Sequence, residues 1–183
     1  MAKSQRKTID KVFILLGVVT IAVFMAIGGL AWWGYHFATN EVKTELSSQK
    51  IYFPAKGSPA IAALPAANQT QMNMYAGQQL VNGAQAKVYA NDFIAFHLSE
   101  VAGGKTYSQV STAALADPTN TTLQTQKAVL FQGETLRGLL LGDGYAYWTF
   151  GMLAKTAAIV AFIGAGVMAI LVWLGMIHLA RSK

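Results

Sequence analysis

Two long uncharged segments dominate the pattern of hydrophobic and polar positions along the chain. Residues 12–33 and residues 156–179 contain no charged side chain. At a rise of about 1.5 Å per residue, either segment as a helix can cross a hydrocarbon core of about 30 Å. Because a helix satisfies its own backbone hydrogen bonds in lipid, we predict transmembrane helices over residues 12–35 and 154–179.

The charges that flank these segments predict the orientation. Before the first segment, one acidic residue, Asp10, stands among four basic residues, Lys3, Arg6, Lys7 and Lys11. After the second segment, the charged residues are Arg181 and Lys183. By the positive-inside rule, residues 1–11 and 180–183 are cytoplasmic tails of a plasma-membrane protein, and residues 36–153 are extracytoplasmic. A cleaved signal peptide is the alternative for the first segment. The apolar core of a signal peptide is about 7–15 residues long. The uncharged segment over residues 12–33 is longer, which favours an uncleaved anchor.

Aromatic side chains cluster where both predicted spans meet the outer surface. Such amphipathic rings prefer the membrane–water interface. The expected anchors are Trp32, Trp33, Tyr145, Tyr147 and Trp148.

Small residues recur at every fourth position of the second span, namely Ala157, Ala161, Ala165 and Ala169. Residues four apart share a helix face, and small ones there permit close approach of another helix. Alanine is also common in membrane helices without any such role. We favour a packing face that contacts the first span or a partner.

The middle of the chain predicts helices and no strand of useful length. Three prolines, Pro54, Pro59 and Pro65, predict an irregular linker or surface strap over residues 54–70. Apolar residues at helical spacing predict a helix over 84–102 and another over 118–141. Asp117 would cap the second of these, and Gly142 to Gly144 would interrupt the chain before the second span. The expected fold class is an all-α membrane protein, an antiparallel hairpin of two transmembrane helices with a largely helical extracytoplasmic domain.

Composition narrows the function classes. Residues 41–150 contain seven basic and seven acidic side chains, so no basic patch for nucleic acid is expected. The chain contains no cysteine, which excludes disulfides and thiolate sites.

The middle region contains a predicted helix that ends in His97, Glu100 and Gly-Gly-Lys-Thr-Tyr at 103–107. The Asp117-Pro118 pair follows, and Leu136-Arg137 precedes the second span. In these features the chain resembles a family of small actinobacterial two-pass membrane proteins. The resemblance covers about half of the chain. It differs by extra residues over 142–153 and a longer Pro/Ala linker. The family has no settled function, although members are sometimes labelled aromatic ring-opening dioxygenases.

The residues offer little for such chemistry. A non-haem iron site needs two histidines and a carboxylate, but His36 and His178 lie at opposite ends of the predicted spans. The Gly-Gly-Lys-Thr segment lacks the upstream glycine of a phosphate-binding loop. His97 and Glu100 could form a general-base pair or an ordinary solvated pair, and no nucleophile accompanies them. We therefore expect no enzyme activity, no cofactor and no metal.

The remaining signal is an excess of aromatic side chains in a neutral domain, which would suit a protein or ligand contact at Tyr89, Phe93, Phe96 and His97. We expect a non-catalytic accessory or scaffolding subunit of a larger membrane complex. Its partners would be the lipid bilayer and other integral membrane proteins or further copies of itself. The alternative is an extracytoplasmic ligand-sensing or envelope-stress module.

Overall fold

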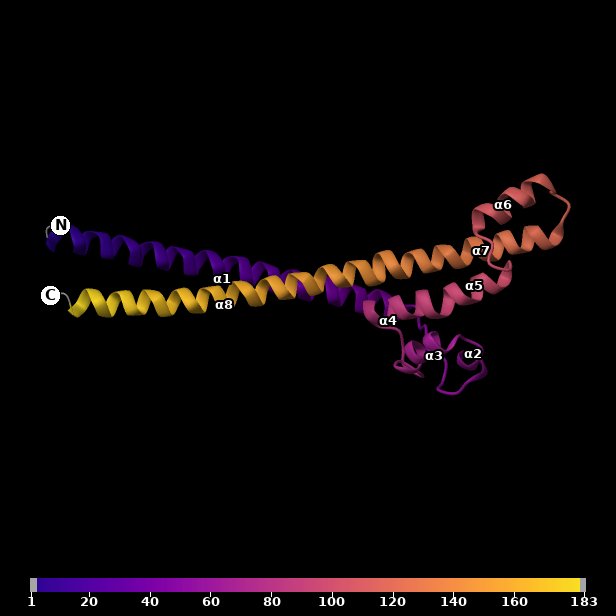
Figure 1. Ribbon diagram of the computed structural model, residues 1–183, viewed down its shortest axis with the longest axis horizontal. Coiled ribbons are helices and arrows are strands. Elements are labelled where there is room, and N and C mark those ends of the chain that lie inside the picture. Colours follow the sequence, from indigo (N-terminus) through magenta and orange to yellow (C-terminus); the bar gives the residue numbers. More distant parts are fainter. Residues whose placement is uncertain (1–2, 182–183) are drawn as a thin grey trace. The chain divides into compact units, whose positions relative to one another are not determined.

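The computed structural model describes residues 3–181, which are almost entirely helical (Figure 1). The outermost residues of the predicted tails, 1–2 and 182–183, lie outside this range. The elements in order are α1 (Lys3–Ser48), α2 (Pro59–Ala62), α3 (Ala66–Asn73), α4 (Gly83–Val88), η1 (Tyr89–Ile94), α5 (Ala95–Val101), α6 (Tyr107–Ala116), α7 (Thr121–Leu139), η2 (Leu140–Ala146) and α8 (Tyr147–Arg181). Within residues 3–181 no strand forms, and one isolated bridge joins Tyr52 and Gln79. The predicted all-α class is confirmed.

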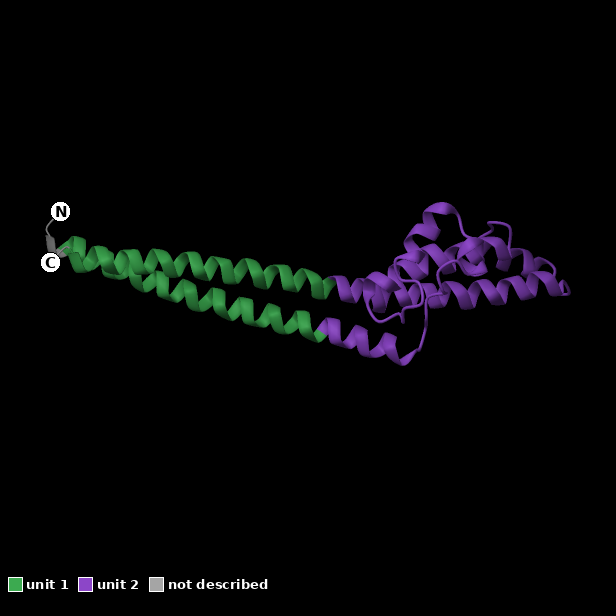
Figure 2. Ribbon diagram, turned by 90° about the horizontal axis from the view of Figure 1, so that it is seen from below, with its two compact units in different colours: residues 1–37, 150–183 green, residues 38–149 purple. Residues whose placement is uncertain are grey.

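The chain divides into two compact units (Figure 2). Unit 1 consists of residues 1–37 and 150–183, and unit 2 of residues 38–149. Two helical stretches, 5–48 and 121–181, are long and apolar enough to cross a membrane, which confirms that part of the prediction. Only 11% and 22% of their most apolar windows are buried within the chain, whereas the core helix of a soluble protein is mostly buried.

Within unit 1, the less exposed positions of both helices recur at alternating steps of three and four. On α1 they are Asp10, Ile14, Gly17, Ile21, Phe24, Gly28 and Ala31. On α8 they are Gly151, Ala154, Ala158, Ala161, Ala165, Met168, Val172, Gly175 and Leu179. This spacing averages 3.5 residues, the repeat that keeps one seam of a helix against another.

Glycines on each helix receive large side chains of the other. Gly17 lies against Val172, and a Cβ at Gly28 would lie 2.6 Å from the Cε1 of Phe162. In return, a Cβ at Gly164 would lie 3.2 Å from Phe24, and one at Gly175 would lie 3.3 Å from Ile14. Because missing side chains on one helix are filled from the other, the two backbones can approach closely.

The packed seam differs from the alanine face predicted from the sequence. Ala161 and Ala165 are buried, but Ala157 and Ala169 are exposed, and Ala158 is fully buried instead. A step of four residues overshoots a turn of about 3.6 residues, so three such steps drift about 120° around the helix. Steps that alternate between three and four stay on one side.

Unit 2 has its own hydrophobic core, and the segment over 54–70 contributes to it. We predicted an irregular linker or surface strap there, but the structure contains α2 and α3, with Ile61 and Leu64 almost completely buried. Pro59 occupies the first turn of α2 and Pro65 precedes α3, positions at which a missing N–H costs nothing. The prolines therefore begin helices here.

Two further helix boundaries differ from the prediction. Residues 107–116 form α6, which begins with a capping box between Thr106 and Gln109. Asp117 ends that helix, and the side chain of Asn120 caps α7 by accepting from the N–H of Leu123. A capping side chain satisfies backbone donors that the first helical turn leaves free.

The glycines at 142 and 144 do not interrupt the helix, because η2 carries it through as a π-helical segment into α8. Gly144 permits a close crossing with α4: a Cβ there would lie 3.0 Å from the Cβ of Ala86. On the other side of the crossing, Gly83 lies directly against Trp148. The crossing closes without any large side chain between the two backbones.

This crossing changes the role of two expected interface anchors. Trp148 is partly buried and packs on the core of unit 2, and the hydroxyl of Tyr145 accepts a 3.4 Å hydrogen bond from Lys87. Both side chains are thus engaged by protein. Trp32, Trp33 and Tyr147 are exposed, as an interfacial anchor requires.

Candidate functional site

The four residues predicted as a contact site form part of a continuous row of rings in unit 2. Buried Phe53 lies 5.3 Å from Tyr89, centroid to centroid; Tyr89 lies 5.1 Å from Phe93, and Phe93 lies 4.4 Å from His97. Phe96 packs edge-on against His97 at 5.7 Å. Such arrangements stabilise a core beyond the area they bury. Tyr89, Phe93 and Phe96 are partly buried against the core, so most of this row is structural.

His97 is the exposed end of the row. Its Nδ1 lies 2.8 Å from the carbonyl oxygen of Phe93. A carbonyl only accepts, so Nδ1 donates. No ion pair joins His97 to Glu100. His97 and Glu100 therefore do not form the base–orienter arrangement that was one of the two alternatives for this pair.

The π-helical segment η1 is held by polar contacts on two sides. Asn68 of α3 donates to the carbonyl oxygen of Asp92 at 3.0 Å, and Arg137 of α7 donates to the Oδ1 of Asn91 at 3.2 Å. Burial raises the pKa of the Asp92 carboxyl, and the nearby Lys87 partly offsets the rise. Burial also raises the pKa of the Tyr89 hydroxyl. A π-helical turn often marks a functional position, but these contacts hold it as a structural junction.

Metal-binding groups are dispersed in both units. Among residues 3–181, no three histidine, aspartate or glutamate side chains converge closely enough to hold an ion. His36 and His178 belong to unit 1, whereas His97 belongs to unit 2. The structure thus brings none of these groups together as a candidate metal site.

One candidate contact surface was not predicted from the sequence, namely an exposed face formed by α7 and the start of η2. We call it the α7 face and define it by residues that all point away from the core, namely Ala128, Phe131, Thr135, Gly138, Leu139 and Gly142. Phe131 is 57% exposed and Leu139 is 55% exposed, and Cβ atoms at the two glycines would meet nothing within 4 Å. The face contains no charged side chain and repeats at steps of three and four, the spacing of a helix–helix seam.

A shallow groove adjoins this face between α6 and α7. It has a volume of about 290 Å³ and is lined by Tyr107, Gln124, Lys127, Ala128 and Phe131. The rings of Tyr107 and Phe131 lie 5.8 Å apart and form its apolar wall. The groove thus combines aromatic surface with one cation, which suits an apolar or aromatic group that carries a negative charge.

No protein-family model, curated protein or solved structure matches this chain. The resemblance around His97 and residues 103–107 therefore stays a prediction. In the structure, that motif is the end of α5, where Gly103 and Gly104 adopt φ values of 59° and 80° that favour glycine.

Proposed function

We propose that this protein is a non-catalytic accessory subunit that binds another membrane protein through helix packing. Unit 1 lies in the plasma membrane as an antiparallel helical hairpin. Both termini are cytoplasmic, and unit 2 lies outside, where it presents the α7 face to the partner.

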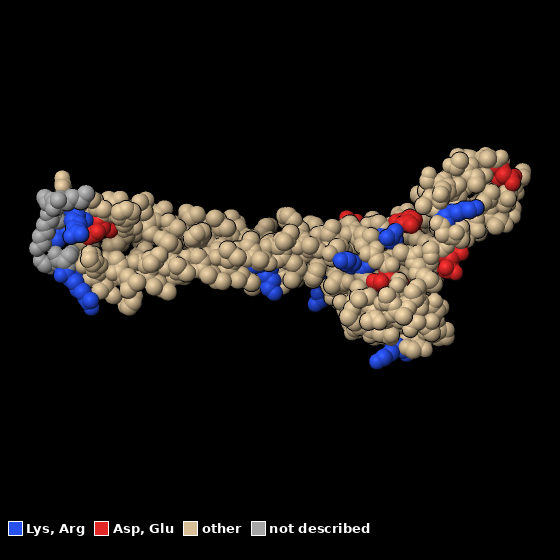
Figure 3. All heavy atoms as spheres, viewed as in Figure 1, with Lys and Arg blue, Asp and Glu red and all other residues tan. Residues whose placement is uncertain are grey.

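The membrane placement is supported by the surface of unit 1. Large apolar side chains stand exposed along both helices, among them Phe13 at 68%, Leu30 at 71% and Val160 at 64%. On the side seen in Figure 3, Lys, Arg, Asp and Glu are scarce along the middle of these helices and gather at their ends. An apolar exterior of this extent is stable in hydrocarbon and would aggregate in water. Gly17 of α1 packs against Val172 of α8, and Gly28, further along α1, packs against the earlier residue Phe162. Residue numbers thus run in opposite directions along the two helices, which supports the antiparallel hairpin.

The α7 face is the observation that carries the proposal. In unit 2, apolar side chains have a core to enter, yet Phe131 and Leu139 remain outside it. The glycines at 138 and 142 leave shallow depressions in this surface, into which side chains of a partner helix can pack. Exposed apolar surface of this kind is typical of a protein contact site.

The test is affinity purification of the full-length protein in mild detergent, followed by mass spectrometry. We expect a partner in constant ratio that Thr135→Glu removes, because the change places a charge in the middle of the α7 face. Thr135 is exposed, so the fold should tolerate the change. Thr122→Glu makes the same change at an exposed threonine of α7 outside the face and should retain the partner. Loss with both variants, or with neither, would refute the assignment of the α7 face.

A second function, ligand sensing, is favoured by the groove between α6 and α7. Its ring pair and Lys127 would hold an aromatic carboxylate. Calorimetric titration with phenylacetate should then release heat with the natural protein and none with Lys127→Gln. Absence of any heat with the natural protein would count against this function.

A further inference from the structure

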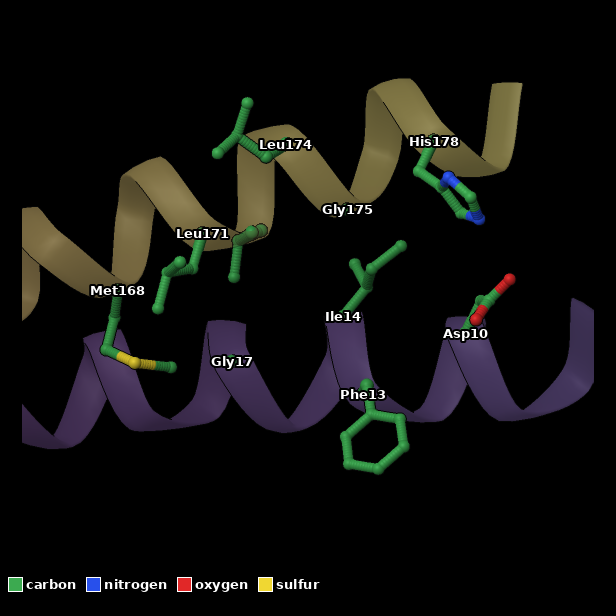
Figure 4. Close-up of a pocket in the computed structure, with 10 residues that line it drawn as sticks. Asp10, Phe13, Ile14, Gly17, Met168, Leu171, Leu174, Gly175 and His178 are labelled. Atoms are coloured by element: carbon green, nitrogen blue, oxygen red, sulfur yellow. The ribbon is translucent and has the colours of Figure 1, made fainter. Parts of the chain in front are cut away.

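Unit 1 contains a groove between the first part of α1 and the last part of α8 (Figure 4). It has a volume of about 380 Å³, within the range of ligand pockets, which is about 300–1,000 Å³. Its walls are apolar side chains of α1 and α8, including Ile14, Met168, Leu171 and Leu174. Gly17 and Gly175 also line it, with Val172 packed on Gly17 and Ile14 packed on Gly175.

The rim of the groove is polar. Asp10 on α1 and His178 on α8 both line it and point toward one another across the gap (Figure 4). No ion pair joins them. Lys7 lies one turn before Asp10, and Arg181 lies one turn after His178, so cations continue both walls toward the chain ends. The rim therefore offers a carboxylate acceptor next to several N–H donors.

We propose that this groove binds an aminophospholipid from the leaflet on the side of the termini. One acyl chain lies along the apolar walls of the groove, the primary ammonium of the headgroup donates to the Asp10 carboxylate, and the phosphate accepts from His178 and Arg181. The proposal rests on the proposed function in one respect, namely that unit 1 lies in a bilayer.

The chemistry of the rim distinguishes this lipid class from others. A primary ammonium has three N–H donors, whereas the trimethylated headgroup of phosphatidylcholine has the same charge and none. Phosphatidylglycerol has the same phosphate but no cation to balance the charge of Asp10. Asp10 is the only acidic residue in the first 40 residues, and it occupies the packed side of α1 at the rim.

The test is a lipid titration of the purified full-length protein in mild detergent, read by native mass spectrometry. The probes are phosphatidylethanolamine, phosphatidylcholine and phosphatidylglycerol with identical acyl chains. A charge-assisted hydrogen bond at this rim should make phosphatidylethanolamine bind about tenfold more tightly than either of the others.

Variants locate the effect at the rim. Asp10→Asn should abolish the preference for phosphatidylethanolamine, and Asp10→Glu should largely keep it, because the acceptor charge remains. Asp143→Asn removes an acidic residue of unit 2 and serves as the matched control, with the preference unchanged. Equal binding of the three lipids, or a preference that survives Asp10→Asn, would overturn the proposal.

Alkaline extraction of cell membranes separates this proposal from the membrane placement. If the protein stays in the membrane pellet and shows no lipid preference, the groove assignment fails and the placement stands. If alkali releases the protein, the placement fails, and the groove assignment fails with it.

Discussion

Replacement of Gly83 by alanine tests the crossing between α4 and η2 that joins two distant parts of unit 2. A Cβ at Gly83 would lie 2.7 Å from the Cγ of Trp148 and 2.9 Å from the carbonyl oxygen of Gly144. Ordinary carbon contacts lie at about 3.5–4.0 Å, so the added methyl does not fit. The carbonyl oxygen belongs to a helix backbone, and it cannot rotate away as the end of a side chain could.

The size of the effect follows from two opposing contributions. Overpacking of this kind costs about 1–3 kcal/mol. Alanine restricts the unfolded chain more than glycine does and returns roughly 0.4–1 kcal/mol. We therefore expect a net loss of about 1–2 kcal/mol, which for a chain of this length lowers the melting temperature by roughly 2–8 °C.

Gly138→Ala is the matched control, since a Cβ there meets nothing within 4 Å. Alanine is favoured over glycine in a helix interior by about 1 kcal/mol, so this variant should melt roughly 2–4 °C higher. Near-ultraviolet circular dichroism of the purified protein in detergent reports the loss of aromatic packing on heating. If Gly83→Ala melts at or above the natural protein, the close crossing is wrong.

Three further expectations concern the helix seam, a buried carboxyl and the topology. Ala158→Phe should lower the amount of folded protein, whereas Ala157→Phe should be tolerated, because Ala158 is fully buried and Ala157 is exposed; equal yields would refute the seam. Burial raises the pKa of the Asp92 carboxyl above its ordinary 3.8, so the folded protein binds this proton more tightly than the unfolded chain does. The melting temperature of the natural protein should therefore fall as the pH rises from below that value to neutral, and the melting temperature of Asp92→Asn should fall less. In intact cells, an impermeant maleimide should label Thr119→Cys and spare Gln5→Cys, since the chain has no native cysteine; the reverse pattern would invert the topology.

The two apolar helices could be predicted from the sequence because hydrophobicity alone identifies them. Their contact register could not be obtained in the same way. In a span where nearly every residue is apolar, the packed and exposed sides have similar composition, so regular alanines such as Ala157 and Ala169 attract attention without being packed. Only the pairing of Gly17 with Val172 and of Gly28 with Phe162 identifies the seam.

In unit 2, some helix boundaries have local sequence signals, but neighbouring residues favour a different structure. Thr106 and Gln109 form a capping-box pattern that predicts α6, although the polar residues that follow obscured it. The glycines at 142 and 144 are typical of a break. The helix nevertheless continues, because the close crossing with Ala86 favours a residue without a side chain at 144. That requirement comes from a contact distant in sequence, which a local pattern does not contain.

The α7 face was obscured by the same limitation. The apolar residues that predict this helix are Leu123, Leu130, Phe131, Leu136 and Leu139, and their pattern does not say which of them face the core. The structure separates them: Leu130 is 2% exposed, whereas Phe131 and Leu139 remain more than half exposed. Leu98 packs on Gly133 and Asn91 accepts from Arg137, and these contacts fix which side of α7 faces the core.

This division also indicates what a partner gains by covering the α7 face. Full burial of a leucine or phenylalanine side chain is worth about 1.5–3 kcal/mol, so covering the exposed halves of Phe131 and Leu139 yields roughly 2–3 kcal/mol together. That gain alone does not offset the entropy lost on association in solution. A partner anchored in the same membrane has already lost part of that freedom, so a short seam is sufficient. The modest size of the α7 face is therefore consistent with a partner held beside it by the bilayer, and it argues against a freely diffusing one.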